Sequence, residues 1–341
     1  MAQTAQQMTS RRKAKMIASG RRRIAVLLLP MFFAVLLLFL LCAETHAEKK
    51  IGILLWNKQP RYLQNVKGLR DSLKQQGFGE PAVTFTIESA NGNKLTAVKK
   101  ARQFVSEKMD MVITVGTTAT VIAANEIKNI PLVFVMVWDP VSSNVAKSWK
   151  SSGNNTTGAS SRTSGPDLLL ALKHFPQVKT VAVLYTPGEK NSEIQVKEFM
   201  AEQDKMQIKI VPVPLNESAI VQPLVSDVAS HVDAICLAGS SVIGDNLAII
   251  VEIATKRGVI TASQSEDLVE SGALLGITVD PYTIGRLAGK KAALVLNGAK
   301  PSSIPIESGQ KFDLLLNRKT ATAGQFQIPK SIMKAVTRIV E

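Results

Sequence analysis

Short, largely apolar runs alternate with longer segments whose apolar residues recur every three or four positions, from Lys50 to the end of the chain. The short runs predict buried strands, and the longer segments predict amphipathic helices. This alternation is typical of βαβ units and a mostly parallel sheet. The predicted strands are 51–56, 83–87, 111–115 and 132–137 in the first half, and 181–185, 208–213, 234–238, 259–262 and 274–278 in the second.

Helical periodicity fills the segments between these strands. Helices are predicted at 62–76, 95–105, 192–206, 242–257 and 282–296. The last of them ends at Asn297-Gly298, as a helix with a glycine C-cap does. Because the chain of 341 residues exceeds the size of one ordinary domain, it is interpreted as two similar α/β halves in series.

Two segments do not follow the alternation. Residues 151–165 are rich in Gly, Asn, Ser and Thr, which predicts a loop or a connection between lobes and marks them as hinge candidates. Beyond Gly298, the pattern predicts an extended segment at 301–306, a strand at 312–316 and a closing amphipathic helix from Ser331. Such a tail can cross back between the lobes.

The first 47 residues have the features of an export signal. Seven basic residues precede an apolar stretch at 24–43, and no acidic residue occurs before Glu44. The stretch is long enough to span a bilayer, while Thr45-His46-Ala47 offers small residues for cleavage before Glu48. A cleaved signal peptide and a retained membrane anchor both stay open. In either case the rest of the chain is expected outside the cytoplasmic membrane, in the periplasm or an equivalent extracytoplasmic space.

Charge and composition exclude several classes of function. The formal net charge of +14 falls to +8 without the first 47 residues, and the lysines are scattered over predicted helix faces, so no nucleic-acid partner is expected. After residue 47 only Cys236, His174 and His231 remain of their types, so neither an internal disulfide nor a Cys/His metal site is expected. No nucleophile elbow is present, and no catalytic residue or cofactor is assigned.

Polar and aromatic residues follow the predicted strands in both halves. In open parallel sheets, ligands bind at the carboxyl ends of the strands, where helix N-termini present free N–H groups. The residues at this edge are Trp56-Asn57, Gly116-Thr117-Thr118, Trp138-Asp139-Pro140, Tyr185-Thr186-Pro187, Gly239-Ser240-Ser241, Ser263 to Glu266, and Asp280-Pro281-Tyr282.

Each of these residues also has a purely structural interpretation. Thr117 and Thr118 can cap a helix or offer hydroxyls to a ligand, with Gly116 allowing close approach of the backbone. Asp139 can start a turn or accept a ligand ammonium. The aromatic residues can pack or stack on a ligand. Their coincidence at one edge favours a binding site.

Six stretches, taken together and in order, resemble the ABC transporter substrate-binding proteins whose best-known members take up tryptophan or tyrosine. The resemblance covers residues 50–338. The matching stretches are "VITVGTTAT", "IPLVFVMVWDPVSS", "NNTTGAS", "VKTVAVLYTPGEKNS", "DLVESGALLGITVDPYTIGRLAGKKAALVLNGAKPSSIPIE" and "KFDLLLNRKTA".

The resemblance implies a type I periplasmic-binding-protein fold, with two doubly wound parallel-sheet lobes joined by three crossovers. The lobes would be 48–160 plus 281–310 and 161–280 plus 311–341. It implies a ligand in the cleft between them. The candidate contacts, including Gly116 and Tyr282 from the strand-edge argument, are Asn57, Gly116, Thr117, Thr118, Asp139, Tyr185, Asn191, Ser192, Ser240, Glu266, Asp280 and Tyr282.

The resulting hypothesis is an exported, monomeric solute-binding component of an ABC importer. Its ligand would be a small polar or amino-acid-like molecule, aromatic ones included, and its partner an ABC permease in the cytoplasmic membrane. No cofactor is needed. A membrane-tethered sensory protein and an exported α/β enzyme are the alternatives.

Overall fold

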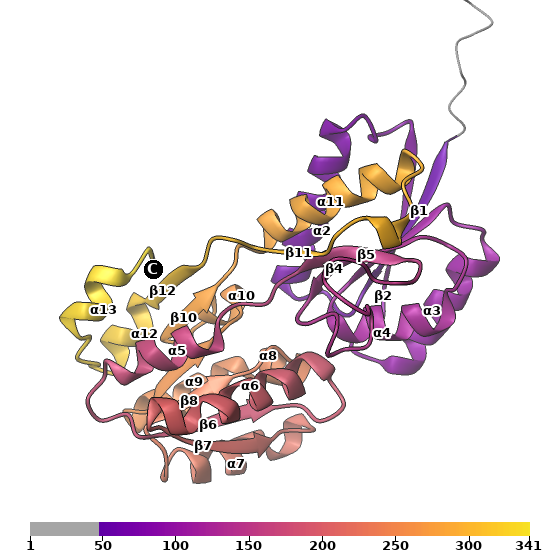
Figure 1. Cartoon of the computed structure of the whole chain (residues 1–341). Coiled ribbons are helices and arrows are strands. Elements are labelled where there is room, and N and C mark those ends of the chain that lie inside the picture. The colour runs from indigo at the N-terminus through magenta and orange to yellow at the C-terminus, as the bar shows by residue number, and fades with distance from the viewer. Residues whose placement is uncertain (1–47) are drawn as a thin grey trace, which may run out of the picture. The chain divides into compact units, whose positions relative to one another are not determined.

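The computed structural model describes residues 48–341, which contain two separate β-sheets (Figure 1). The export signal predicted for residues 1–47 lies outside the described residues. The first sheet has the strand order β11-β5-β4-β3-β1-β2, and all its pairs are parallel. Its strands are β1 (Lys49–Leu55), β2 (Val83–Ser89), β3 (Met111–Val115), β4 (Leu132–Val137), β5 (Thr156–Ser160) and β11 (Glu307–Ser308).

The second sheet has the order β13-β12-β10-β9-β8-β6-β7. Only the pair β10–β12 is antiparallel. Its strands are β6 (Thr180–Tyr185), β7 (Lys209–Pro214), β8 (Ala234–Leu237), β9 (Ile260–Ser263), β10 (Leu275–Thr278), β12 (Asp313–Asn317) and β13 (Arg338–Val340).

Helices connect the parallel strands in both lobes. They are α2 (Pro60–Gln75), α3 (Lys94–Ser106), α4 (Thr117–Glu126), α5 (Gly165–Lys173), α6 (Lys190–Met206), α7 (Val221–Val228), α8 (Ser241–Asp245), α9 (Leu247–Lys256), α10 (Glu266–Glu270), α11 (Pro281–Leu296), α12 (Arg318–Ala323) and α13 (Lys330–Ala335). Short 3-10 turns occupy Ser218–Ile220 and Pro301–Ser303. None of the helices between residues 48 and 341 has the length and apolarity that a bilayer span requires.

The chain passes between the lobes three times, as predicted. The passages lie between β5 and α5, between β10 and α11, and between β11 and β12 (Figure 1). The crossover helix α11 returns to the first lobe and packs along α2. The two doubly wound parallel-sheet lobes and three crossovers confirm the predicted fold class. The residue ranges predicted for the lobes agree with the strand memberships and stay a proposal.

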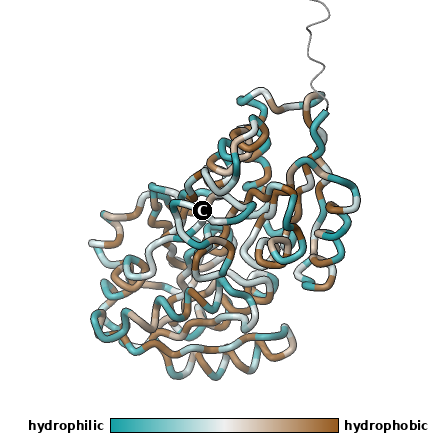
Figure 2. The backbone as a smooth tube through the Cα atoms, turned by 45° about the vertical axis from the view of Figure 1, so that its right-hand side comes forward, coloured by the Kyte–Doolittle hydropathy of each residue, from teal (hydrophilic) through white to brown (hydrophobic). Residues whose placement is uncertain are grey.

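Each lobe has its own apolar core. The first lobe buries one cluster around β1 and β3, in which every residue of β3 is buried. The second lobe buries two clusters, built around Leu168 and Val183 and around Leu184 and Ile250. Strands covered by helices on both faces need apolar residues at consecutive positions rather than at alternate ones. Figure 2 shows the resulting alternation of hydrophobic and hydrophilic segments along the described chain.

The predicted loop at 151–165 contains a strand, so that interpretation was incomplete. Strand β5 is polar in sequence, yet all five of its residues are buried. Its hydroxyls bond to main-chain carbonyls: Thr157 Oγ1 donates to the oxygen of Ile304 at 2.9 Å, and Ser160 Oγ to that of Trp138 at 2.7 Å. Because these hydroxyls have hydrogen-bond partners, their burial has little cost. Composition alone therefore missed the strand.

Three further elements differ from the predictions. The predicted helix 242–257 divides at Asn246, whose side chain donates to the carbonyl of Val242 at 2.8 Å. The predicted extended segment 301–306 begins as a 3-10 turn. The closing helix α13 is followed by strand β13, which pairs with β12 in parallel. A three-residue strand at a sheet edge gives little periodicity to detect.

Glycines allow α2 and α11 to pack at backbone distance. A Cβ built on Gly68 would lie 2.1 Å from the carbonyl oxygen of Tyr282, and one built on Gly285 would lie 2.1 Å from that of Asn65. Contacts of this length with backbone atoms require the helices to move apart.

We predict that Gly285→Ala destabilises the protein by about 1–3 kcal/mol, because overpacking outweighs the roughly 1 kcal/mol gain in helix propensity. Gly165→Ala is the matched control, since its Cβ would meet no atom closer than 3.9 Å. Urea unfolding measures both variants. Equal stability of Gly285→Ala and the wild type would show that the helices do not require this close approach.

Candidate functional site

A small cavity lies where the carboxyl ends of the two sheets meet. Its volume is about 30 Å³, which is room for one or two water molecules. Both lobes line it, through Arg61, Tyr62, Thr117, Met136, Trp138, Ser161, Asn191, Gln195, Gly239, Gln264, Ser265 and Val279. A solute as large as an amino acid therefore requires the lobes or these side chains to move apart.

The loop between β3 and α4 forms one wall. Gly116 has φ of 100°, and a Cβ there would lie 3.1 Å from the ring of Tyr62. Glycine tolerates this conformation and this approach. Thr117 Oγ1 accepts a hydrogen bond from the backbone N–H of Trp138 at 3.0 Å. The Thr118 hydroxyl is buried and has no hydrogen-bond partner in the described structure. The N-terminus of α4 thus carries one buried hydroxyl without a hydrogen-bond partner among residues 48–341, although Thr118 does not line the cavity.

A bulge in β4 changes the direction of the chain at Met136. The pairing of β4 with β5 shifts register between Val135 and Val137, and Met136 has φ of 61°. Bulges next to binding sites redirect side chains, and a non-glycine residue with positive φ persists only where its surroundings stabilise it. Met136 lines the cavity and contacts Asn65 through its sulfur. The bulge gives the cavity an adaptable apolar wall.

Trp138 bridges the lobes on the other side of the cavity. Its indole Nε1–H donates to Glu198 Oε2 of α6 at 3.0 Å. Arg162, in the first crossover, forms ion pairs with Glu198 at 2.7 Å and with Asp139 Oδ2 at 3.0 Å. The remaining oxygen of Asp139 accepts from the N–H groups of residues 141 and 142. Asp139 is thus committed to a turn and an ion pair that orient Trp138.

The second-lobe wall is a chain of amides. Gln195 Oε1 accepts from the N–H of Gly239 at 3.0 Å, and its Nε2 donates to Gln264 Oε1 at 3.4 Å. Gln264 in turn donates to Thr163 Oγ1 of the first crossover at 2.9 Å. Asn191 Nδ2 donates to the carbonyl of Gly239. Amides both donate and accept, so this wall can exchange its internal hydrogen bonds for bonds to a polar solute.

Ser241, at the start of α8, joins the lobes at the rim. Its hydroxyl accepts from Trp56 Nε1 at 2.8 Å and from Asn57 Nδ2 at 3.1 Å. Gln59 Nε2 donates to the Ser241 carbonyl at 3.4 Å. Burial raises the pKa of Glu189, which accepts from the N–H of Ser241. The contacts of Ser241 with Trp56, Asn57 and Gln59 exist only while the lobes lie together.

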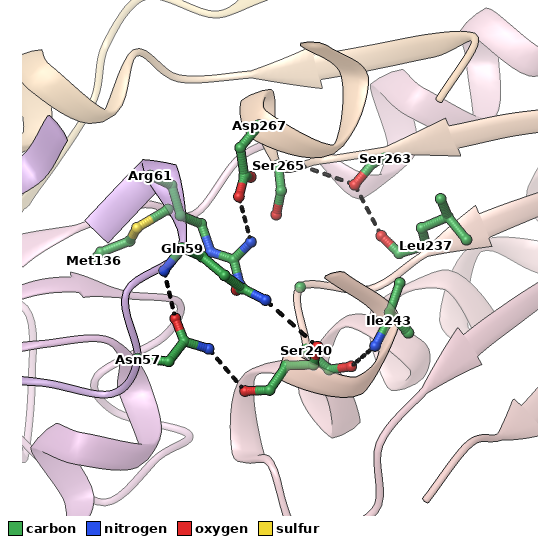
Figure 3. Close-up of polar contacts among 12 residues, drawn as sticks. Asn57, Gln59, Arg61, Met136, Leu237, Ser240, Ile243, Ser263, Ser265 and Asp267 are labelled. Atoms are coloured by element: carbon green, nitrogen blue, oxygen red, sulfur yellow. Dashed lines mark hydrogen bonds and ion pairs between the residues drawn. The ribbon is translucent and has the colours of Figure 1, made fainter. Parts of the chain in front are cut away.

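A buried ion pair crosses the interface beside the cavity. Arg61 reaches from the first turn of α2 toward Asp267 of α10 (Figure 3), with Nη1 and Oδ2 2.7 Å apart. The two side chains are 2% and 7% exposed. The other arm of the guanidinium donates to Gln59 Oε1, and the Arg61 Cζ atom lies 4.7 Å from the centroid of the Tyr62 ring.

The structure brings about half of the predicted site residues to this interface. Thr117 and Asn191 line the cavity, and Gly116 and Asn57 lie in its first-lobe wall and rim. Ser240 is fully buried, caps α8 through the N–H of residue 243 and bonds to Thr186. These assignments stay predictions for ligand contact.

Other predicted residues lie elsewhere. Ser192 bonds to the backbone of Thr186, and Tyr185 packs against the second-lobe core. The Tyr282 hydroxyl donates to Asp71 on α2 at 3.0 Å, outside the cavity. Strand-end position placed these residues at the correct edge without showing which way their side chains point.

Glu266 and Asp280 line a second cavity of about 350 Å³, next to the second and third crossovers. Asp280 caps α11 by accepting from the N–H groups of residues 282 and 283. Glu266 Oε1 pairs with Arg338 at 2.7 Å. Burial, assisted by the nearby carboxylates and opposed by Arg338, raises the pKa of Glu266 to about 7.

Sequence reasoning missed the residues that project from helices into the site. Arg61, Gln195 and Asp267 lie in helices, where charged and amide residues face solvent by default. A signal was available for Arg61, because Pro60 starts a helix directly after the first strand and so places the next residue at the sheet edge. Asp267 has a similar signal, because it is the second residue of α10, which follows strand β9 closely, and no such signal marks Gln195.

The described residues offer no metal cluster and no reactive thiol. Residues 48–341 contain no group of three or more His, Cys, Asp and Glu side chains arranged to hold a metal ion. Burial raises the pKa of Cys236 to about 12, so the thiol of this strand residue stays protonated at neutral pH.

We predict that the unfolding free energy falls as pH rises from about 4.5 to about 7. The folded state keeps a proton on Glu266 that the unfolded chain, with the ordinary pKa of 4.5, releases. Glu266→Gln should flatten this dependence, and Glu217→Gln, at an exposed glutamate, should not. Urea unfolding at several pH values in this range measures the pH dependence of the unfolding free energy for the wild type and both variants. Parallel pH curves for Glu266→Gln and the wild type would refute the raised pKa.

Several known proteins are similar to this chain in sequence and in fold. A curated tyrosine-binding protein from Clostridioides difficile is 26% identical over 286 residues, which cover 83% of each chain. A structure of a Streptococcus pneumoniae ABC domain in complex with L-Trp has 26% identity and a TM-score of 0.82, covering 86% of this chain and 100% of that one. The ligand-free, open structure of a Clostridium difficile substrate-binding protein has the same identity and a TM-score of 0.67, covering 86% of this chain and 99% of that one.

The sequence model of one protein family matches almost all of the described residues. The family described as ABC transporter substrate binding protein matches residues 50–340. Its members bind small-molecule solutes outside the cytoplasm, cooperate with ABC permeases and are not enzymes. The match spans both sheets and all three crossovers, so this chain belongs to the ABC transporter substrate-binding protein family.

Proposed function

We propose that this protein captures an amino acid with an aromatic side chain in the interlobe cavity and presents it to an ABC permease. The observation that supports this proposal most directly is the set of residues that line the cavity. Tyr62, Met136 and Trp138 form an apolar wall, while Gln195 and Gln264 offer amide groups opposite. Aromatic and apolar walls with a few convergent polar groups are typical of sites for small molecules.

The relatives support the choice of ligand. One is named a tyrosine-binding protein, and another was solved with L-Trp. Both match nearly the whole described chain at 26% identity. Phenolic and indole rings would fit against Trp138 in offset or edge-to-face arrangements.

Closure of the lobes would couple binding to transport. Only about 30 Å³ is enclosed between the lobes, so a solute of amino-acid size has to enter an opened form. Its contacts with both lobes would then favour the closed form, because a ligand shifts an equilibrium toward the state that it binds better. At equal sequence identity, the TM-score is higher to the L-Trp complex than to the open structure, which supports a closed arrangement here.

The oligomeric state, the partners and the location of the protein are also part of this proposal. The protein would act as a monomer without nucleic acid, exported by residues 1–47, which either leave as a signal peptide or stay as a membrane anchor. The scattered basic residues support the proposal that no nucleic acid is bound, and the seven basic residues before the apolar stretch support export.

We predict that Trp138→Ala weakens the binding of L-tyrosine or L-tryptophan by about 10- to 100-fold, because the ligand loses an aromatic wall of its site. Trp149→Ala is the matched control, since Trp149 packs against the first-lobe core outside the cavity. Isothermal titration calorimetry measures both variants. A wild-type protein that binds neither amino acid would contradict the proposed ligand class. Equal losses in the two variants would contradict the proposed place of binding.

A further inference from the structure

We propose that Arg61 and Asp267 recognise the two charges of an α-amino acid, and that the ion pair between them is exchanged for these ligand contacts on binding. Arg61 would hold the α-carboxylate, and Asp267 would hold the α-ammonium. The inference rests on the proposed function of amino-acid capture and assigns its specificity to two residues.

The position of the pair fits this role. Arg61 lies in α2 of the first lobe and lines the cavity, while Asp267 lies in α10 of the second. Their 2.7 Å contact therefore spans the interface that a solute has to enter. When the lobes separate, each residue loses its partner and becomes available to a charge on the solute.

The side chain of Arg61 is suited to bind a carboxylate, and that of Asp267 is suited to bind an ammonium. The planar guanidinium of Arg61 presents a fork that matches a carboxylate with two parallel hydrogen bonds. Asp267 uses only Oδ2 in the ion pair, and its Oδ1 is buried without a hydrogen-bond partner in the described structure. A carboxylate accepts several hydrogen bonds, and an ammonium donates three. The unpartnered oxygen lies ready for a second donor.

The charges around the pair support a zwitterion. Glu189 is 6% exposed, and the positive charges of Arg61 and Lys94 oppose the rise of its pKa that burial causes. Arg61 is thus the buried cation of a cluster that holds two carboxylates, Asp267 and Glu189. A zwitterion gives both Arg61 and Asp267 an opposite charge as a partner and adds no net charge to this cluster. A ligand that lacks one of the two charges leaves Arg61 or Asp267 buried and unpaired, which is far more costly than the loss of one ordinary contact.

Selectivity follows from this cost. Sites that hydrogen-bond a polar group of the correct ligand reject analogues lacking that group by large factors, because the polar groups of the site are left unpaired. Amines without a carboxylate, acids without an ammonium and neutral polyols should all bind weakly. A free α-amino acid should bind tightly.

The test pairs each variant with the ligand analogue that lacks the matching charge. Calorimetry on the full chain uses L-tyrosine, tyramine and 3-(4-hydroxyphenyl)propionate, and the tryptophan series of tryptophan, tryptamine and indole-3-propionate. We expect Arg61→Gln to lose about 100-fold for the amino acid and less than about 3-fold for the amine. Asp267→Asn should show the reverse selectivity, with a large loss for the amino acid and little change for the acid. Arg102→Gln, at an exposed ion pair with Glu126, is the control and should change nothing.

Each possible result either supports or overturns the proposed roles of Arg61 and Asp267. Equal losses for all three ligands of a series would show that the pair only latches the lobes together, and would overturn the inference while the proposed function stands. Should the variants fail to fold, the wild type alone suffices, because similar affinities for tyrosine and tyramine would also overturn it. A wild type that binds neither amino acid series and takes up a neutral polyol instead would overturn both the inference and the proposed function.

Discussion

Polar groups at the carboxyl ends of two parallel sheets must find partners when the lobes come together, and this constraint organises the molecule. Burial of an unpaired polar group or charge is costly. The interface meets the requirement with the buried ion pair Arg61–Asp267, with the ion pairs of Arg162, and with neutral hydrogen bonds to Ser241. A solute that enters the interface has to replace these partners. Affinity and selectivity then have the same physical origin.

The rest of the fold holds these groups in place while the lobes move. Trp138 is oriented by Arg162, which lies in the first crossover and binds both Asp139 and Glu198. Gln264 is tied to Thr163 in the same crossover. Groups on both walls of the cavity are thereby connected to the segment that has to bend when the lobes separate. The close glycine-mediated packing of α11 on α2 keeps the helix that carries Arg61 rigid against its own lobe.

The sequence was sufficient for the fold and for the edge of the sheets where the site lies. Buried parallel strands produce continuous apolar runs, and β3 and β4 have the predicted bounds. Strand β5 was missed because its Thr and Ser residues are buried through hydrogen bonds to distant carbonyls, which composition does not reveal. For the site, the sequence predicted only the edge of the sheets at which it lies. Side-chain direction separates Thr117, in the cavity, from Tyr282, which points to Asp71. Arg61 and Asp267 meet only in three dimensions, 206 residues apart in the chain.

A crystal structure of the protein with a bound amino acid, tyrosine or tryptophan, tests the central claim most directly. The account predicts the solute between the lobes, with its carboxylate within hydrogen-bond distance of the Arg61 guanidinium, its ammonium on Asp267 and its ring against Trp138. A complex in which the Arg61–Asp267 ion pair is intact and the amino acid lies outside the interlobe cavity would contradict it.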